Sequence, residues 1–261
     1  MSESRDSFRA NTRLAFVIPA YNEEDLVGQC LKSVVAEVER FGGNVEIVAV
    51  DNNSTDGTAA AIAAFPQVRL VTETRKGPTF ARARGFDEVP DADLVASIDS
   101  DTIVPEGWLD VVADEFARDP RLVCLSGPYI YYDLPLLSRM MVETYYALAV
   151  VIHFVQRRIL RRGAVVQGGN VVLRRKSWIE AGGYDTSIEF YGDDTDIAMR
   201  MSRVGNVKFS HRLRMKTSGR RLATEGMFRT GFTYAINFFW VAFTGRPITK
   251  DYRDIRPSQK R

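Results

Sequence analysis

The chain has 261 residues, of which 45% are hydrophobic and 26% charged, and its formal net charge at pH 7 is +2. Such a composition is that of an ordinary globular protein, long enough for one large α/β domain or for two lobes that share a sheet. A net charge this small gives no reason to expect a nucleic-acid partner. Cys30 and Cys124 match no zinc or redox motif, so we expect both to be apolar core residues in a reducing compartment.

The N-terminal segment and two apolar segments bear on where the protein works. Residues 1–12 are expected to form a polar tail, and they lack the apolar stretch of a secretory signal. Residues 140–155 and 231–243 are strongly apolar, but each is shorter than the roughly 20 residues that a membrane span requires. Helices there would pack on the sheet or, given the neighbouring arginines and aromatic residues, lie on a membrane surface. We therefore expect a cytoplasmic protein. Peripheral contact with the inner face of the plasma membrane is a further hypothesis.

Apolar runs alternate with helical patterns through the first half of the chain. The predicted elements, in chain order, are a strand at Leu14–Ile18, a helix capped by Asn22, a strand at Val45–Val50, a helix at Thr58–Phe65, a strand at Val68–Val71, a helix around Ala81–Phe86, a strand from Leu94 to Asp99, a helix at Glu106–Ala117 with Pro105 in its first turn, and a strand at Leu122–Leu125. This alternation predicts an α/β fold with a mostly parallel central sheet flanked by helices.

The character of the chain changes after Gly127-Pro128, where aromatic and large apolar residues become frequent. We therefore divide one continuous domain into a nucleotide-type half at residues 13–127, a substrate-type half at 128–225, and a C-terminal apolar helix and tail at 226–261. In the second half, strands are predicted at Val171–Leu173 and Val207–Phe209. Helices are predicted at Lys176–Gly183 and from Asp193 to Arg203, with Gly205 as a stop signal.

Polar residues follow three of the predicted strands. Tyr21 and Glu23 follow the first strand, Asp51 the second, and Asp99 and Asp101 end the strand that begins at Leu94. Alternate strand residues project to the same side, so Asp99 and Asp101 could hold a hard divalent cation together with phosphate oxygens. Each residue alone is as well explained as a cap or turn former, but together, at adjacent strand ends, they favour a ligand site. No Gly-x-Gly-x-x-Gly follows the first strand, which argues against a dinucleotide cofactor.

These segments together resemble family 2 glycosyltransferases of the GT-A fold over roughly residues 13–205. The matching motifs are Val17-Ile18-Pro19-Ala20-Tyr21-Asn22-Glu23, Val50-Asp51-Asn52-Asn53-Ser54-Thr55-Asp56-Gly57-Thr58, Lys76-Gly77 with Ala81-Arg82, and Asp99-Ser100-Asp101. The resemblance implies an inverting transferase that uses a nucleotide-diphosphate sugar and Mg or Mn. By position it implies a nucleotide site made by Pro19, Tyr21, Glu23, Asp51, Arg82, Asp99 and Ser100, with the metal on Asp101 and Asp99.

The second half contains two further segments that resemble the family. Asp193-Asp194-Thr195-Asp196 is similar to a Glu-Asp-x-Asp segment, with Asp193 where Glu is more usual, and this implies Asp194 as the catalytic base. Residues two apart on a helix do not share a face, so Asp194 and Asp196 cannot act together, whereas Asp196 can pair with Arg200. A plain helix-capping role for Asp193 or Asp194 is the alternative. Gln167-Gly168-Gly169-Asn170 resembles a Gly-Gly-Asn segment, which implies that Gly169, Asn170 and Asp193 lie beside the donor sugar and the acceptor.

Three basic or metal-binding candidates lie near the C-terminus. His211 is a candidate third metal ligand, although a lone histidine is more often a surface or core group. Arg220 and Arg221 suit a diphosphate leaving group, with a solvated basic loop as the alternative. The Gln-x-x-Arg-Trp signature of processive synthases is absent from the sequence, which favours transfer of a single sugar.

The sequence thus predicts a metal-dependent inverting glycosyltransferase that moves one sugar, preferably from a UDP-sugar, to an acceptor hydroxyl. A lipid or a cell-envelope glycan is the candidate acceptor. Three rivals stay open. The first is a metal-dependent phosphatase, whose Asp-x-Asp would normally lie on the first strand. The second is a non-enzymatic nucleotide-sugar-binding module, and the third is a sugar nucleotidyltransferase, whose glycine-rich phosphate loop is missing after the first strand.

Overall fold

The computed structural model describes residues 2–135, 166–188 and 192–226, together with residues 138, 140, 141, 230, 231, 233, 236 and 240. The elements up to residue 131 are α1 (Ser2–Asn11), β1 (Leu14–Ala20), α2 (Val27–Phe41), β2 (Val45–Asp51), α3 (Thr58–Ala63), β3 (Arg69–Thr72), α4 (Pro78–Asp87), β4 (Leu94–Ile98), β5 (Thr102–Ile103), α5 (Trp108–Arg118), β6 (Leu122–Ser126) and β7 (Tyr129–Tyr131). Those from residue 170 onward are β8 (Asn170–Arg174), α7 (Arg175–Glu180), α8 (Asp193–Val204), β9 (Asn206–Phe209), β10 (Met215–Thr217) and α9 (Arg220–Glu225).

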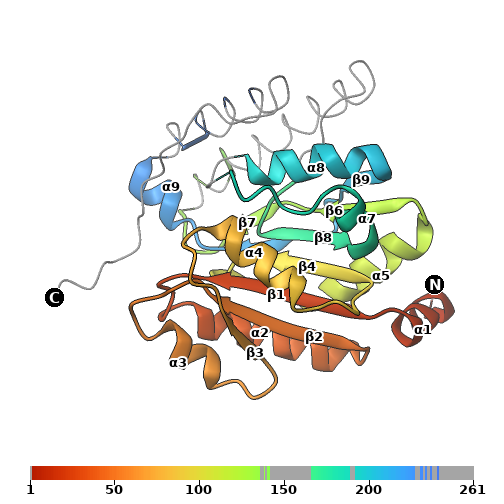
Figure 1. Cartoon of the computed structure of the whole chain (residues 1–261), viewed down its shortest axis with the longest axis horizontal. Helices are drawn as coiled ribbons and strands as arrows, with labels where there is room; N and C mark the ends of the chain where they lie inside the picture. Colours follow the sequence, from red (N-terminus) through yellow and green to blue (C-terminus); the bar gives the residue numbers. More distant parts are fainter. Residues whose placement is uncertain are drawn as a thin grey trace.

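A mostly parallel sheet forms the centre of the described part (Figure 1). Its strands lie in the order β3-β2-β1-β4-β8-β6-β9, and β5, β10 and β7 form a smaller second sheet. β1 pairs in parallel with β2 and β4, whereas β8 runs antiparallel to both β4 and β6. The predicted α/β fold is confirmed, and because β8 lies between β4 and β6, the two predicted halves share one sheet.

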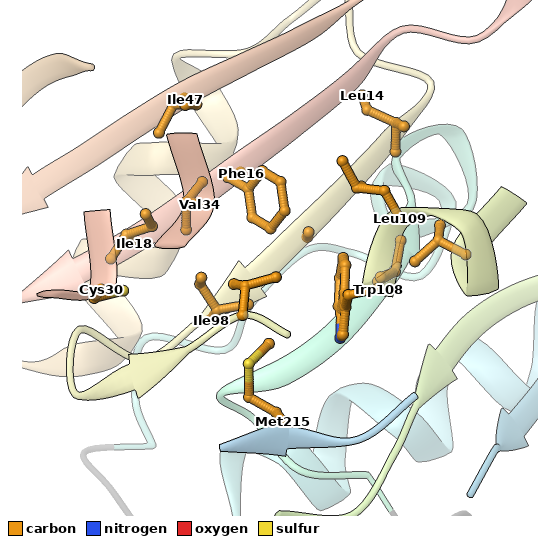
Figure 2. Close-up of a cluster of buried hydrophobic side chains, with 14 of the residues drawn as sticks. Leu14, Phe16, Ile18, Cys30, Val34, Ile47, Ile98, Trp108, Leu109 and Met215 are labelled. Carbon is orange, nitrogen blue, oxygen red and sulfur yellow. The ribbon is translucent and has the colours of Figure 1, made fainter. Parts of the chain in front are cut away.

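Helices cover both faces of the central sheet because the side chains of its strands alternate between the faces. Phe16 and Ile18 of β1 belong to a core that includes residues of α2 and α5. Ala15 and Val17 belong to the core on the other face, which includes residues of α4 and α8. Figure 2 shows the first core, where Trp108 of α5 packs against Phe16 with ring centroids 5.6 Å apart. Both cysteines are buried, as predicted.

The helix after β1 begins later than the sequence predicted. α2 starts at Val27, and Asn22 adopts a left-handed conformation with φ 49° instead of capping a helix. The Asn22 side-chain oxygen accepts a hydrogen bond from the Thr55 amide at 2.9 Å, and Ser54 Oγ accepts one from the Asn22 amide at 3.0 Å. Asn22 therefore fastens the end of β1 to the loop after β2.

Helix α5 likewise begins at Trp108, two residues after the predicted start. The buried carboxylate of Glu37, on α2, accepts hydrogen bonds from the amides of Gly107 at 3.0 Å and Leu109 at 2.8 Å. These contacts satisfy amide groups that a helix start leaves without intrahelical partners. A cap supplied by another helix cannot be recognised from the local sequence around Pro105.

The N-terminal residues form a helix, whereas the sequence predicted only a polar tail. α1 packs on α5, where Arg5 makes two hydrogen bonds to Asp114 at 2.6 and 2.8 Å and Arg9 pairs with Asp110 at 2.8 Å. The predicted apolar helices at 140–155 and 231–243 lie almost wholly outside the described residues. None of the helices that the structure describes is long and apolar enough to span a bilayer.

Candidate functional site

The candidate site lies at the edge of the sheet where β1, β2 and β4 end. Because these neighbouring strands are parallel, their carboxyl ends meet at one edge, and they bring Glu23, Asp51 and Asp99 to it. The helix after β1, α2, and the helix before β4, α4, pack on opposite faces of the sheet, and the strand order reverses between β1 and β4. Ligands of open α/β sheets bind at such a switch point. The predicted convergence of strand ends is therefore confirmed by the topology.

Asp51 and Tyr21 mark the side of the site predicted for the nucleotide. Asp51 is buried at the end of β2, where its carboxylate accepts from the Ser54 amide at 3.4 Å. The Tyr21 hydroxyl accepts a hydrogen bond from Lys76 Nζ at 2.8 Å, and the ammonium lies 4.4 Å from the centre of the Tyr21 ring. Pro19 sits inside β1, opposite Val50 of β2. A carboxylate beside an aromatic ring could hold a nucleobase by hydrogen bonding and stacking.

Asn52 organises this part of the site, although the sequence analysis gave it no role. Its buried amide donates to the carbonyl oxygens of Glu73 at 3.1 Å and Arg75 at 2.7 Å, and it accepts from the Gly77 amide at 2.8 Å. The loop that carries Lys76 is thereby fixed to the end of β2. The sequence shows Asn52 only as one of several turn-forming residues, so no local signal distinguishes this role.

Arg82 links the carboxylates of Asp193 and Asp99. This buried residue of α4 donates to Asp193 Oδ2 at 2.6 Å and to Asp99 Oδ1 at 3.0 Å. Burial lowers its pKa, but the carboxylates of Asp193 and Asp99 more than offset burial and raise the pKa. The resemblance placed Arg82 beside the nucleotide. In the structure, it joins the Asp99 loop to the start of α8.

Asp193 and Asp194 occupy different positions in the first turn of α8. Asp193 is held by Arg82, whereas Asp194 is partly exposed and accepts from the Thr195 amide at 2.7 Å. Burial and then the neighbouring Asp193 charge raise the pKa of Asp194 to about 7. The residue at the N-cap position is Gly192, so neither aspartate occupies it. Asp196 pairs with Arg200 at 2.6 Å, as predicted, and takes no part in the site.

The turn at residues 167–169 brings Asp194 and Asp99 into one site. A Cβ placed on Gly168 would lie 3.4 Å from Asp194 Cβ and 3.6 Å from Arg82 Nη2. A Cβ placed on Gly169 would lie only 2.0 Å from Asp99 Oδ2, so only glycine fits there without moving Asp99. Glycine at position 169 therefore lets the backbone approach Asp99 closely, and the contact of Gly169 with the substrates stays a prediction.

Asn170 has a structural role, which corrects the predicted contact with the donor sugar. Its side chain is fully buried, accepts from Trp108 Nε1 at 3.2 Å, and donates to the carbonyl oxygens of Gly127 at 3.1 Å and Leu213 at 2.8 Å. These three bonds use both amide hydrogens and one lone pair of the amide oxygen. Asn170 therefore ties β8 to α5 and to the two loops that lead to β7 and β10.

Arg220 is the basic residue that reaches the carboxylates of the site. Its Nη2 lies 3.1 Å from Asp101 Oδ2 and also donates to Glu23 Oε1. Arg221, predicted to act beside it, pairs with Glu225 one turn further along α9, at 3.0 Å. Asp133, which the sequence analysis did not identify, accepts from Ser218 Oγ at 2.6 Å and from the Gly219 amide. Asp133 thus positions the turn from which Arg220 projects.

The carboxylates after β4 suit a hard divalent cation. Asp99 and Asp101 offer oxygen atoms, and their side chains remain 38% and 18% exposed, while Ser100 between them is buried. Mg²⁺ is commonly held by one or two carboxylates together with substrate phosphates, so this donor set fits such a cation.

His211 lies on the exposed turn between β9 and β10, where its ring contacts Phe209. Within residues 2–135, 166–188 and 192–226, no three His, Cys, Asp or Glu residues are grouped as metal ligands, and the role of His211 stays a prediction.

Comparison with known proteins decides the family. The model of glycosyl transferase family 2 matches residues 15–183, more than half of the chain. The chain belongs to glycosyl transferase family 2. Among solved structures, a mannosyltransferase from Pyrobaculum calidifontis in complex with GDP-Man and Mn²⁺ superposes with a TM-score of 0.66 at 20% identity, covering 87% of this chain and 63% of that one. Glucosyl-3-phosphoglycerate synthase from Mycobacterium tuberculosis, in complex with Mn²⁺, UDP and phosphoglyceric acid, superposes with a TM-score of 0.62 at 18% identity, covering 92% and 81%.

Curated relatives of this family 2 chain are longer than it is. A poly-beta-1,6-N-acetyl-D-glucosamine synthase from Staphylococcus aureus is 25% identical over 183 residues, which are 67% of this chain and 42% of the relative. An undecaprenyl-phosphate 4-deoxy-4-formamido-L-arabinose transferase from Sodalis glossinidius is 28% identical over 117 residues, which are 42% of this chain and 36% of the relative. The chain thus spans less than half the length of these relatives.

Proposed function

We propose that the chain is an inverting glycosyltransferase that moves a single sugar from a nucleoside-diphosphate sugar, preferably a UDP-sugar, to an acceptor hydroxyl. The observation that carries the proposal is the position of Asp194, whose pKa is raised to about 7, across the glycine turn from Asp99 and Arg82. A general base works best when its pKa lies near the working pH. Asp194 is thus suited to take the proton of an attacking hydroxyl.

The reaction is a single displacement at the anomeric carbon of the sugar. The acceptor oxygen forms a bond to that carbon and gives its proton to a carboxylate oxygen of Asp194, while the bond from the carbon to the diphosphate breaks. The leaving nucleoside diphosphate keeps the electron pair of the broken bond, and the Arg220 guanidinium stabilises its charge. Asp51 and Tyr21 hold the nucleoside. When bound at Asp101 and Asp99, a Mg²⁺ or Mn²⁺ ion would neutralise part of the diphosphate charge.

The donor class is tested by calorimetric titration of the full chain with a panel of UDP- and GDP-sugars, with and without Mn²⁺. One sugar nucleotide should bind in the presence of Mn²⁺, and Asp101→Ala should weaken that binding by at least about tenfold. Asp91→Ala removes an exposed carboxylate in the turn before β4 and serves as the control. Failure of every sugar nucleotide to bind with Mn²⁺ present would contradict the donor class, and with it the proposed transferase.

We further propose a lipid-linked or cell-envelope glycan acceptor and peripheral contact with a membrane. The names of the curated relatives support this acceptor class, because they include an undecaprenyl-phosphate transferase and a succinoglycan biosynthesis protein. Met140, Met141 and Trp240 are exposed large apolar side chains of the kind that enter a bilayer surface. Flotation of the full chain with vesicles that contain anionic phospholipid should carry protein upward, and protein that stays wholly in the lower fractions contradicts membrane contact.

A further inference from the structure

One guanidinium nitrogen joins the two carboxylates that flank the proposed diphosphate position. Arg220 Nη2 donates to Glu23 Oε1 and to Asp101 Oδ2, the latter at 3.1 Å. Glu23 is almost fully buried, whereas Asp101 and Arg220 keep 18% and 27% of their side chains exposed. Arg220 is therefore anchored on its Glu23 side and open to solvent on its Asp101 side.

The charges of this group oppose the binding of a cation on its own. Glu23, Asp101 and Arg220 carry two negative charges and one positive charge, so the guanidinium already balances one carboxylate. A divalent cation at Asp101 would lie next to this guanidinium, and like charges a few ångströms apart repel each other. A diphosphate brings negative charge that both the cation and the guanidinium can share.

The backbone around Arg220 is fixed, while its long side chain keeps several rotatable bonds. The Ser218 amide donates to the Asp101 carbonyl oxygen at 3.2 Å, and Asp133 holds Ser218 and Gly219. The turn is thus attached to the same loop that carries Asp101. The long arginine side chain can rotate about its own bonds to leave Asp101 without any movement of this turn.

We propose that Arg220 makes the divalent cation and the nucleoside diphosphate bind together. In the ligand-free protein its guanidinium occupies Asp101 and opposes the bare cation. When a nucleoside diphosphate arrives, the guanidinium keeps Glu23 and passes from Asp101 to the diphosphate, so that Asp101 becomes available to the cation. This inference rests on the proposed function, since it takes the diphosphate to be the ligand at this position.

The inference is tested by titrating Mn²⁺ into the full chain by calorimetry, with and without saturating UDP. Wild-type protein should bind Mn²⁺ at least about tenfold more tightly with UDP, a coupling in the usual allosteric range. Arg220→Gln should bind Mn²⁺ alone several-fold more tightly than wild type, and its gain in Mn²⁺ affinity on addition of UDP should be several-fold smaller than that of wild type. Lys216→Gln removes an exposed positive charge from neighbouring β10 and should behave as wild type does.

A second variant should change the affinity for Mn²⁺ in the opposite direction, so a folding defect in Arg220→Gln cannot explain both results. Glu23→Gln removes the anchor, so the guanidinium rests on Asp101 alone and the affinity for Mn²⁺ without UDP should fall. Thermal melting checks that each variant is folded. An unchanged Mn²⁺ affinity in Arg220→Gln, or equal Mn²⁺ affinity of wild type with and without UDP, overturns the inference. If UDP does not bind wild type or Lys216→Gln and no UDP- or GDP-sugar binds wild type, the proposed function fails as well. UDP binding with unchanged Mn²⁺ affinity in Arg220→Gln removes the inference alone.

Discussion

Asp193 and Asp194 are neighbours in the chain, yet the start of α8 gives their carboxylates different tasks. Arg82 pairs with Asp193 at 2.6 Å, and this ion pair holds the first turn of the helix against the Asp99 loop. Among the residues that the structure describes, no arginine hydrogen-bonds to Asp194, and the bond from the Thr195 amide fixes the direction of its carboxylate. Its raised pKa follows from burial and from the fixed charge of Asp193.

The Asp194→Asn change tests the base directly. An amide cannot accept the proton, so we expect kcat to fall by roughly 10²–10⁴-fold with little change in donor affinity. In the wild type, the active form is the carboxylate, so activity should rise as the pH increases through about 7 and be lost below it. A pH profile of kcat/KM checks the position of this limb. A profile that is flat between pH 5 and 8 would show that Asp194 is not the titrating base.

For single residues, the sequence predicted which side chains lie at the site better than it predicted their hydrogen-bond partners. The pairing of Asp196 with Arg200 follows from helical spacing alone and is confirmed. By contrast, Arg82 and Arg220 each bridge carboxylates from segments 17 to 197 residues away, and no local pattern encodes such a bridge. Asn170 was misassigned for the same reason, since its three partners come from three separate segments.

The turn that leads into β8 brings the elements of the site together. Gly169→Ala would place a methyl group against Asp99 and push that carboxylate away from Arg82. We expect the affinity for UDP with Mn²⁺ to fall about tenfold while the protein stays folded. Gly168→Ala is the matched control, because its methyl group would make ordinary contacts at 3.4 Å or more. Calorimetric titration of both variants should separate them, and equal affinities would show that Asp99 need not keep its position.

Asn170 at the start of β8 should matter for stability more than for binding. Asn170→Ala leaves the Trp108 indole nitrogen and two carbonyl oxygens without partners, and we expect the free energy of unfolding to fall by about 2–4 kcal/mol. Trp108→Phe breaks only the bond from the indole nitrogen to Asn170. The loss of this one hydrogen bond should lower the free energy of unfolding by less than the loss of all three. Urea unfolding measures both losses. If Asn170→Ala kept full stability but lost affinity for UDP, the result would support the predicted contact of Asn170 with the substrate instead of a structural role.

The boundaries of elements depend on partners that are distant in sequence. α2 and α5 begin later than predicted because Asn22 is tied to the loop after β2 and because Glu37 caps α5 from another helix. The strands at the centre were predicted well, since continuous apolar runs such as Leu94–Ile98 are typical of buried parallel strands. The antiparallel direction of β8 could not be predicted, because a run of apolar residues carries no information about direction.

At the scale of the molecule, α1 extends the domain at the end of the chain where the sequence predicted a tail. Arg5 of α1 and Arg212 of the turn after β9 both donate to the buried Asp114 of α5, and Arg5 holds the pKa of that carboxyl below its usual range. A depressed pKa means that this stabilisation is present above the unfolded pKa of 3.8 and is lost as the pH falls below it.

Arg5→Gln tests how much the ion pair with Asp114 contributes to the packing of α1 on α5. Since Arg212 remains on Asp114, we expect the free energy of unfolding at pH 7 to fall by only about 1–2 kcal/mol, with less difference from wild type at pH 3. Arg13→Gln, an exposed change next to β1, is the control. Urea unfolding at both pH values checks the expectation. A loss of the same size at pH 7 and pH 3 would mean that the Asp114 charge is not the cause.

A direct displacement at the sugar with Asp194 as base is the central step of the proposed reaction, and the anomeric configuration of the product reports on it most directly. The measurement is proton NMR of the sugar released to water, before mutarotation, from the α-linked sugar nucleotide that binds most tightly. We expect the β-anomer from wild-type protein and almost none from Asp194→Asn, although that variant still binds the donor. Release of the α-anomer, or equal release by Asp194→Asn, would contradict this mechanism.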